Sequence, residues 1–401
     1  MPLALYPGMK WPRRPVEQIP ADQFKPPFCP NEKCPQHHLD PEDEFRYKKD
    51  ATYFRKRERC RVQRYRCKVC KRCFSQRTFA WSYYLKRPEL GPRIAALLNS
   101  CCGHRQIARL LGCAPSTVTR QVPRIGRHSM LLQCRMLEEL GGITERSAVD
   151  HFETFVGDQL DALGLGTVVG HDSWFVYVID PAPHRRGGKL TPAQKRKLKQ
   201  RKRPLAPPGG VSRSMDRLLD VLTGYLAPGQ TLTLLSDDHP AYRPAVARHP
   251  RSPSIEHFAY PNPARGPKGS PRSREARERD AAMYPVDQYH ALLRHSCSHY
   301  RRETIAFDRR IDAALERGFN TIIWRNLVKW RSERKPDPTT PAMRLGLTDR
   351  PWKWEWVFSQ RLFLTRERVP ECYRKLYRRD WDEDFDGAAG KYARHRLKHA
   401  M

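Results

Sequence analysis

Residues 231–237 read Thr-Leu-Thr-Leu-Leu-Ser-Asp, a short apolar run that closes on an acid. A run of this length and composition predicts a buried strand, with Asp237 at its carboxyl end. Asp238 follows directly, so the run alone does not choose between the two acids. The chain holds 75 Lys and Arg against 43 Asp and Glu. An acid at the end of a strand in so basic a chain suggests a metal ligand.

The segments around this run predict an α/β domain. Apolar runs predict strands at 148–156, 166–169, 174–179, 231–236 and 255–260. Leucines at helical spacing predict a helix at 215–222, and a longer helical region is expected from 286 to about 330. Three strands, a helix, another strand and then an acid on a helix is the element order of a ribonuclease-H-like α/β fold. We therefore expect a mixed sheet covered by helices.

Two further acids have positions comparable to that of Asp237. Asp150 closes the short run 147–150, and Asp287 opens the helical stretch that begins the 286–330 region. Mg²⁺ prefers carboxylate oxygens, and two such ions can activate a hydroxyl and steady a leaving oxygen in phosphodiester chemistry. Neighbouring strands could bring the three acids together. Chance is a competing explanation, and the alternatives Glu153, Glu303 and Asp308 stay open at this point.

Length and charge narrow the class of protein. At 401 residues the chain predicts two or three domains. The formal charge of +32 indicates a polyanionic partner, usually nucleic acid, because each neutralised phosphate releases counterions. A basic membrane-binding protein or a ribosomal component is the alternative. We find no apolar run of about 18 residues and no signal peptide, so we expect a soluble, intracellular protein.

Six of the twelve cysteines lie between positions 29 and 73. Cys29 and Cys34 form a C-x4-C pair, and Cys67 and Cys70 form a C-x2-C pair. Two such pairs can present four thiolates to one structural Zn²⁺, which would let a polar segment fold without a large apolar core. The alternative is incidental buried cysteine. The spare candidates Cys60 and Cys73 stay open, and His37 and His38 are expected to be solvated loop residues.

Residues 103–120 predict a helix, a turn and a second helix. Ile107, Ala108 and Leu111 form an apolar face, and Gly112 permits the positive backbone angle that ends the first helix. The second helix begins near Pro115. Four of its side chains are expected to point outward toward a DNA major groove: Ser116, Thr117, Arg120 and Arg124. The alternative is an ordinary helical hairpin inside a core.

From about residue 25 to 365 the chain resembles a bacterial insertion-sequence transposase with a zinc ribbon, a helix-turn-helix and a DDE/D nuclease domain. Residues 236–242 resemble the family's second-acid motif, an acid followed five positions later by Tyr, which selects Asp237 over Asp238. Residues 286–294 resemble its third-acid motif, an acid followed seven positions later by Arg. Residues 301–307 resemble a basic-Thr-aromatic segment, where the family usually carries Lys instead of Glu303.

Two departures from the family pattern concern the third motif. Asp287 stands where Glu is common, and the shorter side chain reaches less far toward a metal ion. His290 stands where the family often has Asn.

The resemblance implies a domain order and a set of partners. A zinc-ribbon DNA-binding domain is expected at 1–80, a helix-turn-helix domain at 81–140, a catalytic domain at 141–335 with a basic insertion at 183–213, and a basic C-terminal region at 336–401. In the last region, the aromatic residues from Trp352 onward are expected to pack between helices, and the alternative is that they stack on DNA.

The implied activity is Mg²⁺- or Mn²⁺-dependent DNA cleavage and strand transfer by Asp150, Asp237 and Asp287. The two N-terminal domains would bind terminal inverted repeats, and target DNA would be the second substrate. Arg294 would hold a phosphate or form a surface salt bridge. A homo-oligomer on DNA, in the cytoplasm at the nucleoid, is expected. The alternatives are a non-catalytic DNA-binding regulator, a decayed transposase remnant, and a structural nucleic-acid-binding protein.

Overall fold

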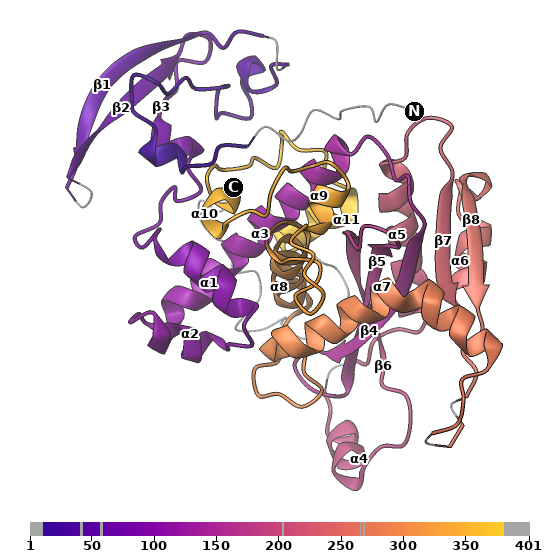
Figure 1. The fold of residues 1–401 in the computed structure, drawn as a ribbon. Helices are drawn as coiled ribbons and strands as arrows, with labels where there is room; N and C mark the ends of the chain where they lie inside the picture. The colour runs from indigo at the N-terminus through magenta and orange to yellow at the C-terminus, as the bar shows by residue number, and fades with distance from the viewer. Residues whose placement is uncertain are drawn as a thin grey trace.

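The computed structural model describes residues 11–40, 43–56, 59–202, 204–264, 266–267 and 269–380 (Figure 1). Parts of the predicted regions lie outside these ranges. Among them are residues 1–10 of the zinc-ribbon domain, Arg203 of the basic insertion, and residues 381–401 of the basic C-terminal region. Of the helices within the described ranges, none combines the length and the apolar character that crossing a bilayer requires.

A small antiparallel sheet in the order β1-β2-β3 forms the N-terminal part. Its elements are η1 (Val16–Gln18), η2 (Pro35–His37), β1 (Tyr47–Arg55), β2 (Cys60–Cys67), β3 (Cys73–Ser75) and η3 (Gln76–Phe79). The core beneath the sheet consists largely of aromatic rings, with Tyr65 stacked on Phe74 at 5.8 Å and Phe24 against Phe79 at 5.9 Å. So small a core needs further support, which a metal ion can supply.

Three helices connect the two sheets: α1 (Leu90–Leu98), α2 (His104–Leu110) and α3 (Pro115–Glu139). The first turn of α3 is exposed, whereas from Gln121 onward the helix is almost entirely buried. Its buried part packs on α8, where Gly126 lies so close to Glu316 that an added Cβ would meet its backbone at 2.4 Å. The helix-turn-helix is therefore joined rigidly to the large domain.

The large sheet is mixed and has the strand order β6-β5-β4-β7-β8. Its strands are β4 (Ser147–Phe155), β5 (Asp161–Gly170), β6 (Val176–Arg185), β7 (Leu232–Asp237) and β8 (Ile255–Tyr260). The first three strands run antiparallel to one another, while β7 is parallel to β4 and β8 is parallel to β7. Every residue of β5 is buried, because helices cover both faces of the sheet.

Helices α5 (Gly210–Gly224) and α6 (Tyr242–Arg248) lie on one face of the sheet, and α7 (Arg274–Ser296) and α8 (Ile311–Ile323) lie on the other (Figure 1). On the first face, Leu218 approaches Gly166. On the second, Ile179 approaches Gly318. The remaining elements are α4 (Pro192–Lys199), η4 (Ser252–Ser254), η5 (Ser298–Tyr300), η6 (Trp324–Val328), α9 (Pro341–Arg344), α10 (Trp354–Val357) and α11 (Glu371–Arg378).

The expected mixed α/β architecture with a small N-terminal sheet is confirmed, but several predicted boundaries are wrong. Strands β5 and β6 extend well beyond their apolar runs. Helix α7 begins at Arg274, inside the stretch 261–279, whose Pro, Gly, Ser and Arg content favours a linker, because Ser273 caps the helix by accepting a hydrogen bond from the Ala276 amide. The helical region 286–330 is interrupted after residue 296, where the chain turns to form a β-bridge between Asp308 and Val156.

The C-terminal segment from Trp352 to Glu367 contacts several other parts of the protein. Trp352 stacks on Trp11 at 5.6 Å, so this ring packs inside the protein, although against a loop residue and not between helices. The Arg361 amide donates to the Phe79 carbonyl at 2.7 Å, which attaches the segment to the small sheet. Arg135 of α3 forms a bidentate ion pair with the buried Glu367. The segment therefore holds the small sheet, α3 and the large domain together.

Replacing Gly126 with Ala should lower the free energy of unfolding by about 1–3 kcal/mol, because the new methyl group would overlap the backbone of α8. Gly224→Ala is the matched control, since no atom lies within 4 Å of the added methyl group there. The control should leave stability unchanged or raise it by up to about 1 kcal/mol. Urea unfolding measures both, and equal stability of the two variants would contradict the close helix crossing.

Candidate metal centres and nucleic-acid interface

The helix-turn-helix has the local geometry that its sequence predicts. Ile107, Ala108 and Val118 are buried between α2 and α3. Gly112 has a φ of +58°, the left-handed conformation that lets the chain leave α2 without strain. Pro115 is the first residue of α3, where its missing amide proton costs nothing.

The exposed first turns of α3 present polar side chains. Ser116 and Arg120 are exposed and Thr117 is partly exposed, so these three face outward as expected. Arg124 differs, because it is half-buried with its guanidinium 5.7 Å from the centre of the Trp81 ring. Burial lowers the pKa of Arg124 to about 10. The expectation that Arg124 points outward is therefore wrong, since the rings beneath α3 offer it a cation–π contact.

Cys29, Cys34, Cys67 and Cys70 converge at one point beside the small sheet. Their four sulfur atoms all lie within 4.8 Å of one another, with 3.5 Å between the Sγ atoms of Cys29 and Cys70 and 3.8 Å between those of Cys34 and Cys67. Tetrahedral Zn²⁺ with Zn–S bonds of about 2.3 Å requires sulfur separations of about 3.8 Å. The four cysteines therefore fit a structural zinc ion.

The electrostatics of the thiols also fit a bound cation. Burial raises the pKa of Cys29 and that of Cys34. Burial also raises the pKa of Cys70, but hydrogen bonds at Arg72 and Asn31 outweigh it and lower the value to about 7. Four thiolates at this spacing would repel one another without a cation between them. Cys73 does not join the group: it is exposed, with its sulfur 3.6 Å from a carboxylate oxygen of Asp50.

His37 is not a solvated loop residue, contrary to expectation. It is fully buried, with Nδ1 at 2.7 Å from the Cys29 carbonyl and Nε2 at 2.8 Å from the Thr365 hydroxyl. It thus links the first cysteine pair to the C-terminal segment. Sequence could not reveal this link, because the partner hydroxyl lies 328 residues away.

The three predicted aspartates come from the two central parallel strands and from the helix that crosses them. Val149 of β4 pairs with Ser236 of β7, so Asp150 and Asp237 are the next residues on adjacent strands about 4.8 Å apart. Asp237 ends β7 as predicted. Asp150 is the fourth residue of the nine-residue β4, and Asp287 lies in the middle of α7, so the predicted strand end and helix start are wrong.

His290 of α7 holds the Asp150 carboxylate. Its Nδ1 lies 3.5 Å from Asp150 Oδ2, and its Nε2 lies 2.5 Å from the Thr167 hydroxyl, which in turn donates to the Asp150 carbonyl at 3.2 Å. Burial raises the pKa of Asp150, but the hydrogen bond and charge of His290 outweigh it and keep the pKa below its usual value. Asp150 is therefore ionised and fixed in orientation, as a metal ligand must be.

The negative charge of the Asp237 carboxylate is less well compensated by its neighbours than that of Asp150. Burial and the neighbouring Asp150 carboxylate raise its pKa. Its Oδ1 atom is buried and has no hydrogen-bond partner among the described residues. A buried carboxylate oxygen without a partner is costly, and a divalent cation would satisfy it. Asp150 and Asp237 thus fit a Mg²⁺ or Mn²⁺ ion.

Arg279 is the residue that sequence reasoning missed. It lies on α7 two turns before Asp287, with its Nη1 atom 2.5 Å from Asp287 Oδ2. Burial lowers its pKa, but the hydrogen bond with Asp287 and the charges of Asp287, Asp150 and Asp237 outweigh this effect and raise the pKa. One guanidinium therefore serves as a counter-ion for all three acids. Within the described ranges, the three aspartates do not bring their oxygens within 4.8 Å of one another, unlike the cysteine sulfurs.

The alternative acids have other partners. Asp238 is exposed and pairs with Arg243 at 3.1 Å. Glu153 pairs with His184 at 3.1 Å. Burial raises the pKa of Asp308 to about 6, and this acid lies 3.3 Å from the Arg317 side chain. Glu303 is exposed.

Arg294 also has internal partners. Its guanidinium donates to the carbonyls of Glu153 and Tyr300 and lies 4.1 Å from the centre of the Phe152 ring. It thereby fastens the end of α7 to β4. This contact is neither of the two roles predicted for it.

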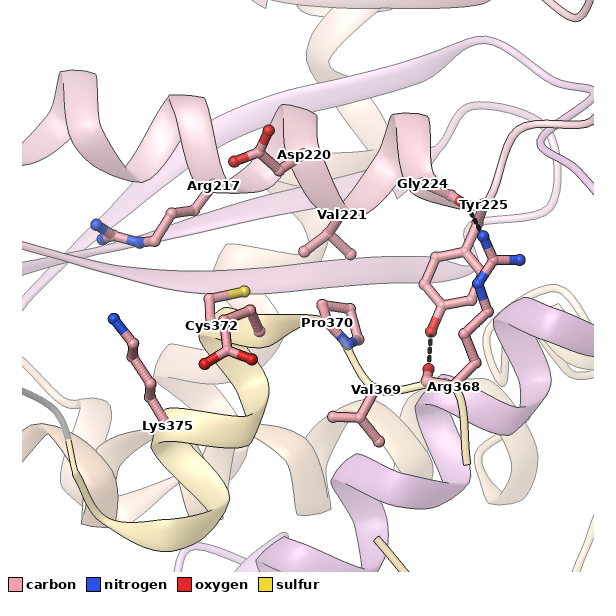
Figure 2. A pocket seen from close by; sticks show the side chains of 11 residues that line it. Arg217, Asp220, Val221, Gly224, Tyr225, Arg368, Val369, Pro370, Cys372 and Lys375 are labelled. Carbon is pink, nitrogen blue, oxygen red and sulfur yellow. Dashed lines mark hydrogen bonds between the residues drawn. The ribbon is translucent and has the colours of Figure 1, made fainter. Parts of the chain in front are cut away.

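A cavity of about 540 Å³ lies between α5 and the segment that leads into α11 (Figure 2). Arg217 at one end is paired with the buried Asp180 at 2.7 Å, and Tyr225 at the other donates to the Arg368 carbonyl at 2.5 Å. Burial raises the pKa of Cys372 to about 12, so this thiol is protonated near neutral pH. The lining contains none of the predicted site residues, and the cavity is not part of the candidate site.

Comparison with known proteins supports the helix-turn-helix part of this description. Residues 92–124 match a family described as a helix-turn-helix domain. The match covers most of α1, all of α2 and the exposed first turns of α3. No curated protein matches the chain. A helix-turn-helix domain suggests binding to double-stranded DNA.

Replacing Cys34 with Ser should reduce the zinc content of the purified protein from about one ion per chain to almost none, because three thiolates bind Zn²⁺ far more weakly than four. Cys73→Ser is the matched control and should keep its zinc, since that thiol points away from the site. Zinc released by thiol modification and measured with a chromogenic chelator gives the stoichiometry. Full zinc content in Cys34→Ser would contradict the assignment.

Proposed function

We propose that this protein is a DNA transposase of the DDE/D type, which binds terminal inverted repeats and catalyses metal-dependent cleavage and strand transfer. The observation that carries the proposal is the register of β4 and β7, which brings Asp150 and Asp237 together with one carboxylate oxygen that has no hydrogen-bond partner among the described residues. The sheet order β6-β5-β4-β7-β8, antiparallel and then parallel, supports the ribonuclease-H-like fold that the sequence predicts.

The matched helix-turn-helix family is also found in transposases, which supports a role in recognising the ends of the element. Ser116, Thr117 and Arg120 are the side chains placed to contact DNA. The zinc ribbon would add phosphate contacts through exposed cations such as Lys48 and Lys49 on β1. Such an enzyme would act at the nucleoid in the cytoplasm, as a homo-oligomer that joins two DNA ends.

Asp150, Asp237 and Asp287 would hold the catalytic Mg²⁺ or Mn²⁺. When bound, two such ions activate water and then a 3′-hydroxyl and stabilise the leaving oxygen. The protein's own part is to fix the ligands. His290 orients the Asp150 carboxylate, and the His151 amide donates to its Oδ1 atom at 2.7 Å. The His151 side chain is held in turn by Tyr242, whose hydroxyl lies 2.8 Å from its Nδ1 atom. Arg279 would have to release Asp287 before that acid could act as a ligand.

A second candidate function is a non-catalytic DNA-binding regulator, either a transcription factor or a decayed transposase. The specific observation in its favour is the ion pair of Arg279 with Asp287, which leaves the third acid occupied. For such a regulator, Arg279 would be a sufficient counter-ion for the aspartates. The helix-turn-helix and the zinc ribbon would then provide the DNA-binding function without any catalysis.

Asp150→Asn should abolish cleavage of inverted-repeat DNA, a loss of at least about a thousandfold, while DNA affinity stays within about twofold of wild type. Cleavage is followed on labelled DNA in Mn²⁺, and affinity is measured by fluorescence anisotropy. The control Asp238→Asn should cleave like wild type, because that exposed acid pairs with Arg243 on the surface. Cleavage by Asp150→Asn at the wild-type rate would refute the catalytic assignment.

Arg279→Gln should strengthen Mn²⁺ binding by about threefold to tenfold, because it removes a cation that competes for the acids. Arg277→Gln removes an equal charge from an exposed position on the same helix and should leave the affinity unchanged. Free Mn²⁺ is measured by electron paramagnetic resonance. Weaker binding in Arg279→Gln than in the control would show that Arg279 organises the acids rather than competing for them.

A further inference from the structure

Helix α4 projects from the large domain between β6 and α5, at the lower end of the molecule in Figure 1. None of its residues is buried, so core packing does not explain its presence. It is nevertheless a capped helix: the Thr191 hydroxyl accepts from the Gln194 amide at 3.2 Å, and the Gln194 side chain accepts from the Thr191 amide at 3.0 Å.

The turn between β4 and β5 holds this helix in place. Lys197 pairs with Asp158 at 3.3 Å, and Arg201 pairs with Asp161. The Gln194 side chain donates to Gln159 at 2.9 Å. Two ion pairs and one amide–amide hydrogen bond thus fasten one side of the segment to Asp158, Gln159 and Asp161, and α4 has a definite position on the domain.

The other side carries cations without acidic partners. Lys195, Arg196, Lys199 and Lys202, hereafter the α4 cations, are all exposed, and none of them forms an ion pair with a residue in the described ranges. The stretch 184–202 contains no acid. Like charges four positions apart, as in Lys195 and Lys199, destabilise a helix by about 0.2–0.5 kcal/mol, so the arrangement costs free energy unless a polyanion binds it.

The position of α4 relative to the aspartates suits a DNA duplex. The β4–β5 turn that holds it begins five residues beyond Asp150 along β4, a distance of roughly 17 Å. A duplex advances about 3.4 Å per base pair, so DNA positioned at the aspartates would reach the turn within about five base pairs. Phosphate contacts there need no base recognition.

We propose that α4 is a sequence-independent binding site for the phosphate backbone of duplex DNA, with the α4 cations as its contacts. Its placement beside the reacting phosphates rests on the proposed function. The binding itself does not, because it requires only charge and position.

The test compares wild type with the fourfold variant K195Q/R196Q/K199Q/K202Q on a duplex that contains no element end. The slope of log affinity against log salt concentration should become shallower by roughly 3.6, since each of the four phosphate contacts contributes about 0.9. Affinity at 0.1 M salt should fall by at least about tenfold. Fluorescence anisotropy without added Mg²⁺ measures both, and circular dichroism confirms that the variant is folded.

The matched control is R334Q/K335Q/R350Q/K353Q, which removes four exposed cations from the segment around α9, away from α4 in Figure 1. It should change the slope by less than about 1. Equal losses in both variants, or an unchanged slope in the α4 variant, would overturn the proposal. Loss of binding to anionic lipid vesicles with DNA affinity retained would also overturn it. No cleavage is required, so a nuclease domain without activity leaves the test valid.

Discussion

The parallel pairing of β4 with β7 is the constraint on which the candidate site depends. It places Asp150 and Asp237 on adjacent strands in a chain that otherwise carries a large positive charge. Two carboxylates this close need a cation. His290 compensates part of the negative charge of Asp150, and Arg279 compensates part of that of Asp237. The oxygen that still lacks a partner is where the described structure leaves room for a metal ion.

A second constraint is mechanical. Helix α3 begins as the exposed second helix of the helix-turn-helix and ends buried against α8, so a DNA contact at its start is fixed relative to the large sheet. The C-terminal segment adds a further connection, since it bonds to the small sheet, to α3 and, through Thr365, to His37 beside the cysteines. Recognition and chemistry would therefore occur on one rigid frame.

Sequence predicts those features that depend on local pattern. The paired spacing of Cys29, Cys34, Cys67 and Cys70, and the strand that ends at Asp237, could all be inferred before the fold was known. Arg279 could not, because its contact with Asp287 depends on a helix that begins in a stretch whose Pro, Gly and Ser content predicts a loop. The buried His37 and the inward Arg124 likewise depend on residues distant in the sequence or on rings packed from another segment.

The central claim is that Asp150 and Asp237 bind a divalent metal ion. The most direct measurement is a crystal structure of the protein soaked in Mn²⁺, with anomalous diffraction recorded on both sides of the manganese absorption edge. The account predicts a manganese peak within bonding distance of both carboxylates, with the Arg279 side chain moved away from Asp287. A crystal that shows zinc at the four cysteines but no manganese between the two aspartates would contradict it.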